Sequence, residues 1–520
     1  MLHVAPVRTA LKTAAVSAFR RRQLHSSCPR PVQRLLWAGA VLDETSPRLR
    51  AATSAWLAAL GMGQDAEYGI TFTNLAASTS HSLLSYRTLP PSSRELPAPP
   101  DAEDTDSQSR DPGRPKLLPG EGPVRAEQDS PLKYVGLEKI ISVGRNTFSE
   151  LGLGFSSHES TWGMVRSLSN FSGSSQIKQL GAGLNTSWAV TSSSPGSSDM
   201  LFAWGNHSLG QLGLGSVPGQ SASTSGEAQL QLYSTPKQVE LPQIPGEQED
   251  LRYTIDKVAV GLDHALVLRS WIDHSGERQS QVLGCGLNTD AQLGLPLNTP
   301  LASSLTSIDA EGSPTSITAG GDTSFSFNSG SKTASAWGNS EYAQALWGSR
   351  PIDRIESPVS IEEQLHEAIG DDKVKDIAAG GSFSLILTGS GRVLAAGYGA
   401  IGRAAVGGAP QSFVLQEVAV LAGQNVRMIA SGLEYACAIT SDERLFAWGL
   451  NSRFGRLGLG SQSGSAQEDL RIFEPKEVPL PPSVVDNQYQ IEGIACGGDV
   501  MWVLVEQEDG TDQKGRWLGR

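Results

Sequence analysis

The sequence predicts an all-β protein, a seven-bladed β-propeller with a disordered N-terminal presequence and disordered insertions. Three observations predict this fold class. The 520 residues include 57 glycines, their apolar runs are short, and two sequence patterns alternate along most of the chain. Many turns and short strands are typical of all-β architectures. A length prior suggests about three domains, but stacked repeats share one continuous core, so we expect a single repeat body.

The N-terminal segment, residues 1–34, carries seven Lys or Arg and no Asp or Glu. An Arg-rich, acid-poor segment that contains Ser and Thr is typical of a mitochondrial transit peptide. Apolar residues from Val4 to Phe19 can form one helical face, with Arg8 and Lys12 on another, which suits import against an inside-negative potential. The run Arg20-Arg21-Arg22 resembles a processing site. The alternative interpretation is a disordered basic tail.

The first repeated pattern is an apolar strand, an anchor glycine, and a polar stretch that ends in Leu-Gly. Its clearest copies are residues 201–215 and 445–460. Seven copies place anchor glycines at Gly39, Gly144, Gly205, Gly286, Gly338, Gly397 and Gly449. The shortest spacing is 52 residues, and a period of about 50 residues with several short strands indicates propeller blades. Tryptophans recur at one position of this pattern, which favours a packing layer over a ligand cage.

The second pattern is an alternating apolar strand, a small-Gly turn and another strand. It also occurs seven times, between the copies of the first, from residues 77–84 to residues 494–504. We therefore expect the propeller to cover residues 35–505, with the half-repeats 35–42 and 491–505 completing the ring. Residues 90–131 are rich in Pro, Asp and Ser and predict a disordered insertion. Residues 506–520 are expected to form a C-terminal tail.

Charge and cysteine spacing exclude several function classes. Without the leader, 34 basic and 54 acidic residues give a net charge of −20, which disfavours general DNA or RNA binding, although a local basic patch could still exist. Cys285, Cys437 and Cys496 lack metal-ligand spacing and are interpreted as buried small residues. Glycine strings such as residues 210–215 recur in blades and open no helix, so they do not predict a dinucleotide site. We expect no cofactor, no metal site and no enzyme.

The copies at 201–215, 445–460 and 257–268 resemble the repeats of the regulator-of-chromosome-condensation family, and the resemblance covers about residues 35–505. Two segments resemble the mitochondrial branch of that family, residues 337–344 and 397–402. Fold alone does not transfer function. The resemblance nevertheless implies a seven-bladed propeller that binds a partner on one of its faces.

The resemblance also implies a set of functions. Nuclear members exchange nucleotide on the small GTPase Ran. Mitochondrial relatives are implicated in large-ribosomal-subunit maturation, rRNA association and exchange on a dynamin-like fusion GTPase, and fungal relatives in respiratory-chain assembly. The leading hypothesis is a noncatalytic interaction propeller in the mitochondrial matrix, or on the matrix face of the inner membrane as a peripheral protein, acting on a GTPase or an assembly intermediate. Alternatives are a large-subunit/rRNA assembly factor and a respiratory-complex assembly scaffold.

Candidate partner-binding residues come from two sources. Four acids occupy nearly equivalent turn positions and either form an acidic docking surface or cap the turns: Asp263, Asp322, Glu434 and Asp499. Four residues lie in the segments that resemble the mitochondrial branch, where exposure would indicate a partner hot spot and burial would indicate core: Glu341, Tyr342, Tyr398 and Ile401. The last candidate is His264. The family often has His at this position, and here it recurs only at His81, so a structural turn role is favoured over a catalytic one.

Overall fold

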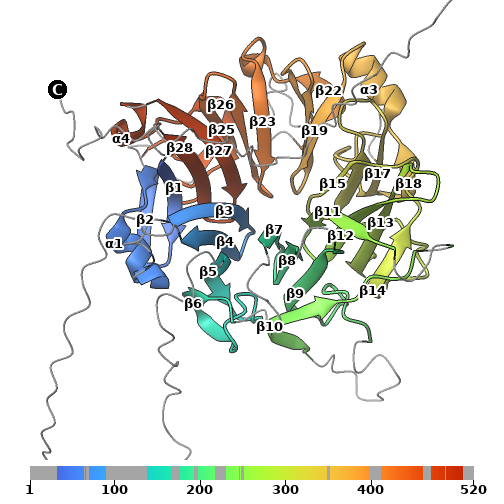
Figure 1. Cartoon of the computed structure of the whole chain (residues 1–520). Coiled ribbons are helices and arrows are strands. Elements are labelled where there is room, and N and C mark those ends of the chain that lie inside the picture. Colours follow the sequence, from blue (N-terminus) through green and yellow to red (C-terminus); the bar gives the residue numbers. More distant parts are fainter. Residues whose placement is uncertain are drawn as a thin grey trace, which may run out of the picture.

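The computed structural model describes residues 32–63, 65, 70–88, 138–166, 176–192, 197–216, 230–244, 246, 251–347, 352–398, 411–460, 470–486 and 488–507. These residues form seven four-stranded antiparallel sheets arranged in a ring around a central axis (Figure 1). The predicted seven-bladed propeller is confirmed. Residues 1–31, the predicted insertion 90–131 and residues 508–520 lie outside the described residues.

Each blade runs outward from the axis, from its first strand to its fourth. The first blade along the chain consists of β3 (Ile70–Ala77), β4 (His81–Thr88), β5 (Glu138–Asn146) and β6 (Ser157–Met164). The next is β7 (Gln176–Ala182), β8 (Thr186–Ser192), β9 (Met200–Asn206) and β10 (Leu232–Val239). The third is β11 (Tyr253–Val260), β12 (His264–Ile272), β13 (Arg278–Leu287) and β14 (Leu301–Ile308).

Three further blades follow the same order. They are β15 (Ser316–Ala319), β16 (Thr323–Phe327), β17 (Ala334–Asn339) and β18 (Arg354–Ser360); β19 (Val374–Ala379), β20 (Phe383–Thr388), β21 (Val393–Tyr398) and β22 (Gln411–Glu417); and β23 (Val426–Ser431), β24 (Tyr435–Thr440), β25 (Leu445–Leu450) and β26 (Arg471–Glu477). Short helices lie between blades: α3 (Glu362–Ile369), η3 (Ala419–Leu421) and α4 (Pro482–Val485).

The seventh blade closes the ring by combining both ends of the repeat region. Its strands β1 (Val32–Val41) and β2 (Glu44–Ala51) come from the N-terminal side, and β27 (Tyr489–Cys496) and β28 (Val500–Gln507) from the C-terminal side. Strand β1 pairs with β28 from Val32↔Gln507 to Gly39↔Val500, so blue and red strands lie side by side in Figure 1. The predicted closure by the two half-repeats is confirmed, and it joins two strand edges that would otherwise stay unpaired.

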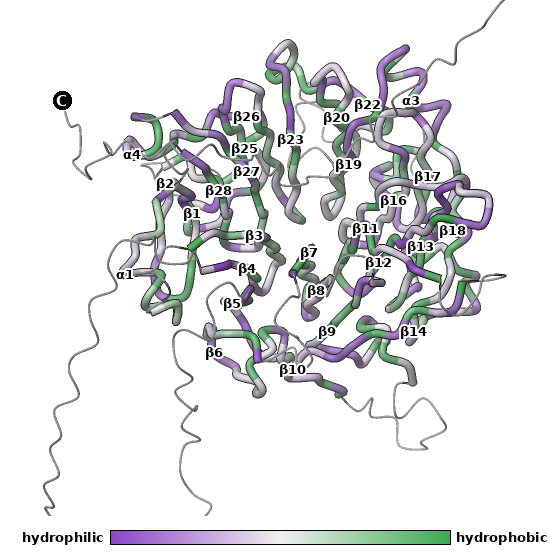
Figure 2. The backbone as a smooth tube through the Cα atoms, in the orientation of Figure 1, coloured by the Kyte–Doolittle hydropathy of each residue, from purple (hydrophilic) through white to green (hydrophobic). Residues whose placement is uncertain are grey.

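The core lies between neighbouring sheets, because most inner strands are buried on both faces. Strand β12 is buried over His264–Ser270, and all of β20 is buried. The recurrent tryptophans are at most 1% exposed and form the predicted packing layer: Trp37, Trp204, Trp337 and Trp448. Hydrophobic stretches accordingly lie within every blade in Figure 2. Repeated burial of large aromatic side chains is what stabilises sheets that would be marginal alone.

Two inserted segments pack on the ring. Residues 54–62 form α1 (Ser54–Leu57) and η1 (Ala58–Met62), where Trp56 stacks on Trp37 with ring centroids 5.6 Å apart and Met62 is 1% exposed. Residues 270–281 form a hairpin, in which β12 pairs with β13 beyond Ser270↔Ser280. Among the described residues, the helices are all too short or too polar to cross a bilayer.

Candidate partner-binding face

One backbone hydrogen bond recurs in all seven blades and defines one face of the ring. The N–H that follows each anchor glycine donates to the carbonyl oxygen of the residue before the second strand, at 2.7–2.9 Å. The accepting residues are Ser80, Asn185, Asp263, Asp322, Ser382, Glu434 and Asp499. We call the face built from these first-to-second turns and the adjacent third-to-fourth turns the anchor face. The opposite face carries the second-to-third turns and the connections between blades.

The anchor glycines are needed because the chain passes so close to that turn. All seven have φ between 95° and 130°, a region that side chains with Cβ avoid. A Cβ on Gly286 would lie 2.3 Å from the carbonyl oxygen of Asp263, and one on Gly338 would lie 2.2 Å from that of Asp322. The glycines thus fix the anchor face as a rigid frame on which side chains can vary.

The third-to-fourth turns repeat a second device. Asn288 Oδ1 accepts from the Leu293 N–H (3.1 Å), and Gln292 Oε1 accepts from the Asp290 N–H (2.9 Å). The same folded-back side chain occurs in the β3–β6, β7–β10 and β15–β18 blades, where Glu150, Gln211 and Gln344 accept from the residue two positions earlier. The residue at that tip position is half-buried, and it is Phe148, Leu209, Asp290 or Tyr342 in these four turns. Phe454 is the equivalent residue of the β23–β26 blade, where its N–H donates to Ser452 Oγ at 3.3 Å instead.

Three acids gather on the anchor face where the β11–β14 blade meets the β15–β18 blade. Burial, followed by the charges of Asp290 and Asp263, raises the pKa of Asp322 to about 6. Burial also raises the pKa of Asp263. The Gln292 amide donates to Asp322 Oδ1 at 3.2 Å and only partly offsets this cost. We call Asp263, Asp290 and Asp322 the acidic cluster. A partly buried group of like charges favours a cation from outside.

An aromatic pair joins the blade of Asp322 to the next blade, with Tyr342 from the β17–β18 turn and Tyr398 from the end of β21. The rings of Tyr342 and Tyr398 have centroids 4.9 Å apart and planes inclined by 53°. Both tyrosines are half-buried, and Glu341 beside them is exposed. Tyr342 is held by the hydrogen bond from its N–H to Gln344 Oε1, at 3.0 Å. Rigid, partly exposed aromatic rings beside charged groups are typical of protein-binding hot spots.

The other two predicted acids differ from the cluster. Arg456 is 5% exposed, donates to Glu434 Oε2 at 2.9 Å, and lies over the ring of Tyr435 at 4.8 Å. The charge of Glu434 is therefore balanced within the protein. Asp499 is exposed on the anchor face. The four acids occupy equivalent turn positions, but only Asp263 and Asp322 belong to one cluster.

His264 is buried inside the ring, at 1% exposure. Its Nε2 lies 3.0 Å from Ser324 Oγ in the next blade, and that hydroxyl donates to the Gln292 carbonyl at 2.7 Å. His81 makes the same contact with Ser187, and Ser187 donates to the Glu150 carbonyl. Burial lowers the pKa of each histidine to about 3. Both therefore stay neutral and join neighbouring blades.

The structure thus brings seven of the nine predicted residues to the anchor face. His264 lies in the core, and Ile401 lies outside the described residues. Sequence reasoning missed Asp290 and the tip series Phe148, Leu209 and Phe454. A signal was present, because each lies two residues before the Glu, Gln or Arg of its turn.

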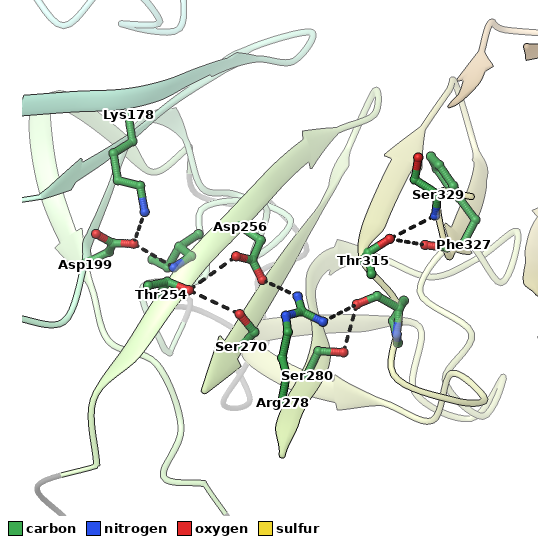
Figure 3. Close-up of polar contacts among 12 residues, drawn as sticks. Lys178, Asp199, Thr254, Asp256, Ser270, Arg278, Ser280, Thr315, Phe327 and Ser329 are labelled. Atoms are coloured by element: carbon green, nitrogen blue, oxygen red, sulfur yellow. Dashed lines mark hydrogen bonds and ion pairs between the residues drawn. The ribbon is translucent and has the colours of Figure 1, made fainter. Parts of the chain in front are cut away.

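Polar contacts on the opposite face are of another kind. Asp256 accepts from Arg278 at 2.9 Å and from Thr254 at 3.3 Å, and Lys178 pairs with Asp199 (Figure 3). These groups link neighbouring strands and blades, with opposite charges paired. In the described part of the chain, no three His, Cys, Asp or Glu side chains are grouped to hold a metal ion on either face.

Comparison with known proteins gives matches for both sequence and fold. Residues 442–504 and 374–400 match the regulator of chromosome condensation (RCC1) repeat. A human RCC1-like G exchanging factor-like protein is 28% identical over 315 residues, which are 59% of this chain and 58% of that protein. The Arabidopsis thaliana ultraviolet-B receptor UVR8 is 27% identical over 40% of this chain and 46% of its own. The matched region is about half the length of these curated relatives.

Two solved structures share the fold. Human WBSCR16 has a TM-score of 0.60 at 20% identity, covering 90% of this chain and 99% of its own. Yeast RCC1 (Prp20), solved bound to Kap60, has a TM-score of 0.59 at 16% identity, covering 99% and 98%. Prp20p of Saccharomyces cerevisiae was also studied for its binding to Gsp1p and histones. At these identities the likeness establishes the propeller fold.

Proposed function

Starting from the premise that this chain belongs to the RCC1 repeat family, we propose that it is a noncatalytic propeller that binds a GTPase through its anchor face and regulates nucleotide exchange. One observation carries the proposal. The anchor face places the acidic cluster and the Tyr342–Tyr398 pair on turns of three consecutive blades, β11–β14, β15–β18 and β19–β22. A basic group of a partner is attracted to the acids while an apolar group covers the rings.

The physical route to exchange is thermodynamic linkage. A propeller that binds the nucleotide-free GTPase more tightly than the loaded form lowers nucleotide affinity by the same factor. The propeller needs no chemical step of its own for this. It needs a rigid surface that matches one conformation of the partner, and the seven repeated backbone hydrogen bonds at 2.7–2.9 Å provide such a surface.

A nucleotide-release assay tests this function. GTPases from mitochondria are loaded with a fluorescent guanine nucleotide and mixed with an excess of unlabelled nucleotide and the full chain. We expect accelerated release from one of them and loss of most of that acceleration in the Asp290→Asn/Asp322→Asn variant. The matched control is Asp309→Asn/Glu311→Gln, which removes two exposed charges from the opposite face at the same junction. No acceleration on any candidate, or equal loss in both variants, would contradict the proposal.

The location is a second part of the proposal. Residues 1–34 have the composition of a mitochondrial transit peptide, so we place the protein in the matrix or on the matrix face of the inner membrane. Import into isolated mitochondria, followed by protease protection and carbonate extraction, tests this. A protected protein supports it, and a chain that stays protease-sensitive outside the organelle contradicts it.

The anchor face gives less support to the two assembly-factor hypotheses than to the GTPase hypothesis. A cluster of three acids repels phosphates, so rRNA is disfavoured as the ligand of the acidic cluster. Affinity purification from mitochondria separates the hypotheses. A GTPase recovered with the wild type and lost with Asp290→Asn/Asp322→Asn supports the present one, whereas ribosomal or respiratory subunits with the same dependence would replace it.

A further inference from the structure

Three sulfur atoms meet inside the joint that closes the ring. Cys437 of β24 and Cys496 of β27 have their Sγ atoms 3.8 Å apart, and Met501 Sδ of β28 lies 3.5 Å from Cys437 Sγ. Neither cysteine forms a disulfide. The three side chains are 0%, 8% and 0% exposed, respectively. They come from two neighbouring blades, the β23–β26 blade and the blade that contains both ends of the repeat region.

Both separations from Cys437 Sγ suit sulfur atoms that share one ion. Metal–sulfur bonds are about 2.3 Å long, and trigonal or tetrahedral coordination then separates the sulfurs by about 3.8–4.0 Å. The two observed separations lie within a few tenths of an ångström of that range. Thiolate and thioether together select soft ions such as Cu(I), which accepts few ligands. The nearby Tyr435 hydroxyl donates to the Val500 carbonyl at 3.3 Å. The ligands that the site offers are therefore the sulfur atoms of Cys437, Cys496 and Met501.

A cavity on the axis lies next to Cys496. Cys496 lines a cavity of about 80 Å³ formed by the first-to-second turns at the anchor-face end of the axis. Its neighbours there are small, and a Cβ built on Gly432 would lie 3.5 Å from the Cys496 Cβ. An ion entering from the anchor face therefore meets Cys496 first and reaches Cys437 and Met501 behind it.

The charge of the occupied site follows from its ligands. A bound ion displaces both thiol protons to solvent and coordinates two thiolates outright. One monovalent ion then leaves one net negative charge.

We propose that Cys437, Cys496 and Met501 form a binding site for a soft monovalent metal ion, Cu(I), that bridges two blades at the closing joint of the propeller. The site is separate from the acidic cluster and from the Tyr342–Tyr398 pair. Its ligands come from β24, β27 and β28, so an occupied site ties the C-terminal strands of the ring to the preceding blade.

The test uses the full chain with Cys28→Ser and Cys285→Ser, which leaves Cys437 and Cys496 as the only thiols. It is titrated without oxygen with Cu(I) held by the coloured chelator bicinchoninate. We expect one Cu(I) per chain, with sulfur scatterers at about 2.3 Å in X-ray absorption. Cys437→Ala/Cys496→Ala abolishes binding. Met501→Leu, which keeps the volume, weakens it by at least about tenfold, a loss typical of even outer-shell changes.

Three outcomes would overturn the proposal. Cu(I) that stays with the chelator would show that the sulfurs serve only as apolar packing. Equal uptake by the Cys437→Ala/Cys496→Ala variant would place the ion elsewhere. Mass spectrometry showing a Cys437–Cys496 disulfide in place of copper would assign the pair to oxidation. Circular dichroism of each variant separates loss of the site from loss of the fold, and Met501→Leu keeps the test decisive if the double variant unfolds.

Discussion

The two faces of the propeller are built on different rules. On the anchor face, the same backbone hydrogen bond recurs seven times at 2.7–2.9 Å, each beside a glycine with φ between 95° and 130°. On the opposite face, the connections differ from blade to blade and include the β12–β13 hairpin, α1 with η1, α3 and α4. The anchor face has a constant backbone with varied side chains, whereas the opposite face varies in its backbone.

This difference indicates where recognition resides. A constant backbone holds the acidic cluster and the Tyr342–Tyr398 pair in fixed positions, which lowers the entropy cost of binding. On the opposite face, charged side chains form ion pairs within the protein, such as Arg278 with Asp256. We therefore expect changes on the anchor face to affect either the whole fold or partner binding. Changes on the opposite face should have small, local effects.

The largest contrast is expected between two glycines with positive φ. Gly286→Ala places a Cβ 2.3 Å from the Asp263 carbonyl oxygen on the anchor face, while Gly276→Ala, in the hairpin turn of the opposite face, meets no atom within 4 Å. We expect Gly286→Ala to lower the free energy of unfolding by about 4 kcal/mol or more, and Gly276→Ala by about 1 kcal/mol. Urea denaturation measures both, and equal losses would remove the distinction between the faces.

The next effect concerns the buried histidines behind the anchor face. Each has a pKa of about 3 in the folded chain against an ordinary 6.5. A lowered pKa means that the stability is complete above pH 6.5 and is lost as the pH falls toward 3. We expect each histidine to account for about 3 kcal/mol of lost stability at pH 4. Unfolding from pH 7 to pH 4 should be flatter for His81→Gln/His264→Gln, and an unchanged slope would contradict the neutral-histidine assignment.

A smaller effect is expected at the aromatic pair. Tyr342→Ala or Tyr398→Ala should weaken partner binding by about 2 kcal/mol each. Because the rings touch, the double variant should lose less than the sum, by about 1 kcal/mol. Isothermal titration with the purified partner measures this cycle. The control Ile272→Ala removes a side chain that is 57% exposed on the opposite face and should leave affinity unchanged; an equal loss there would make the effect nonspecific.

The smallest effect is expected on stability at Asp322, whose pKa of about 6 lies above its ordinary 3.8. A raised pKa means that stability is complete below pH 4 and is lost as the pH rises through 6. Asp322→Asn keeps the acceptor for Gln292 and should raise the free energy of unfolding by about 1 kcal/mol at pH 8, after solvent screening, with no gain below pH 4. An equal gain at pH 4 and pH 8 would contradict this assignment.

Much of the fold could be predicted because each repeat is recognisable from short local sequence patterns. The anchor glycines mark positions where a Cβ would strike a carbonyl oxygen, and strand alternation marks the sheets. The ends of the chain could be paired because the half-repeats flanking Gly39 and Cys496 each lack a partner. The first four-stranded blade could be recognised despite the 105 residues between Gly39 and Gly144, since an insertion in a connection leaves the strand patterns intact.

The site was less predictable because its members meet across blades. Asp290 and Asp322 are 32 residues apart in sequence, and their proximity depends on how two sheets pack. The pairing of Glu434 with Arg456 separates this acid from the cluster in the same way. The burial of His264 follows from Ser324 of the next blade, and no local pattern encodes it. The Tyr342–Tyr398 contact also spans two blades, although sequence resemblance had placed both residues among the candidates.

The central claim is that the anchor face is the partner-binding face. Photo-crosslinking in intact cells tests it most directly, with Tyr342→p-benzoylphenylalanine on the anchor face and Ile272→p-benzoylphenylalanine on the opposite face. We predict a discrete adduct with a GTPase from position 342 and none from position 272. An adduct from position 272 alone, or the same adduct from both positions, would contradict the claim.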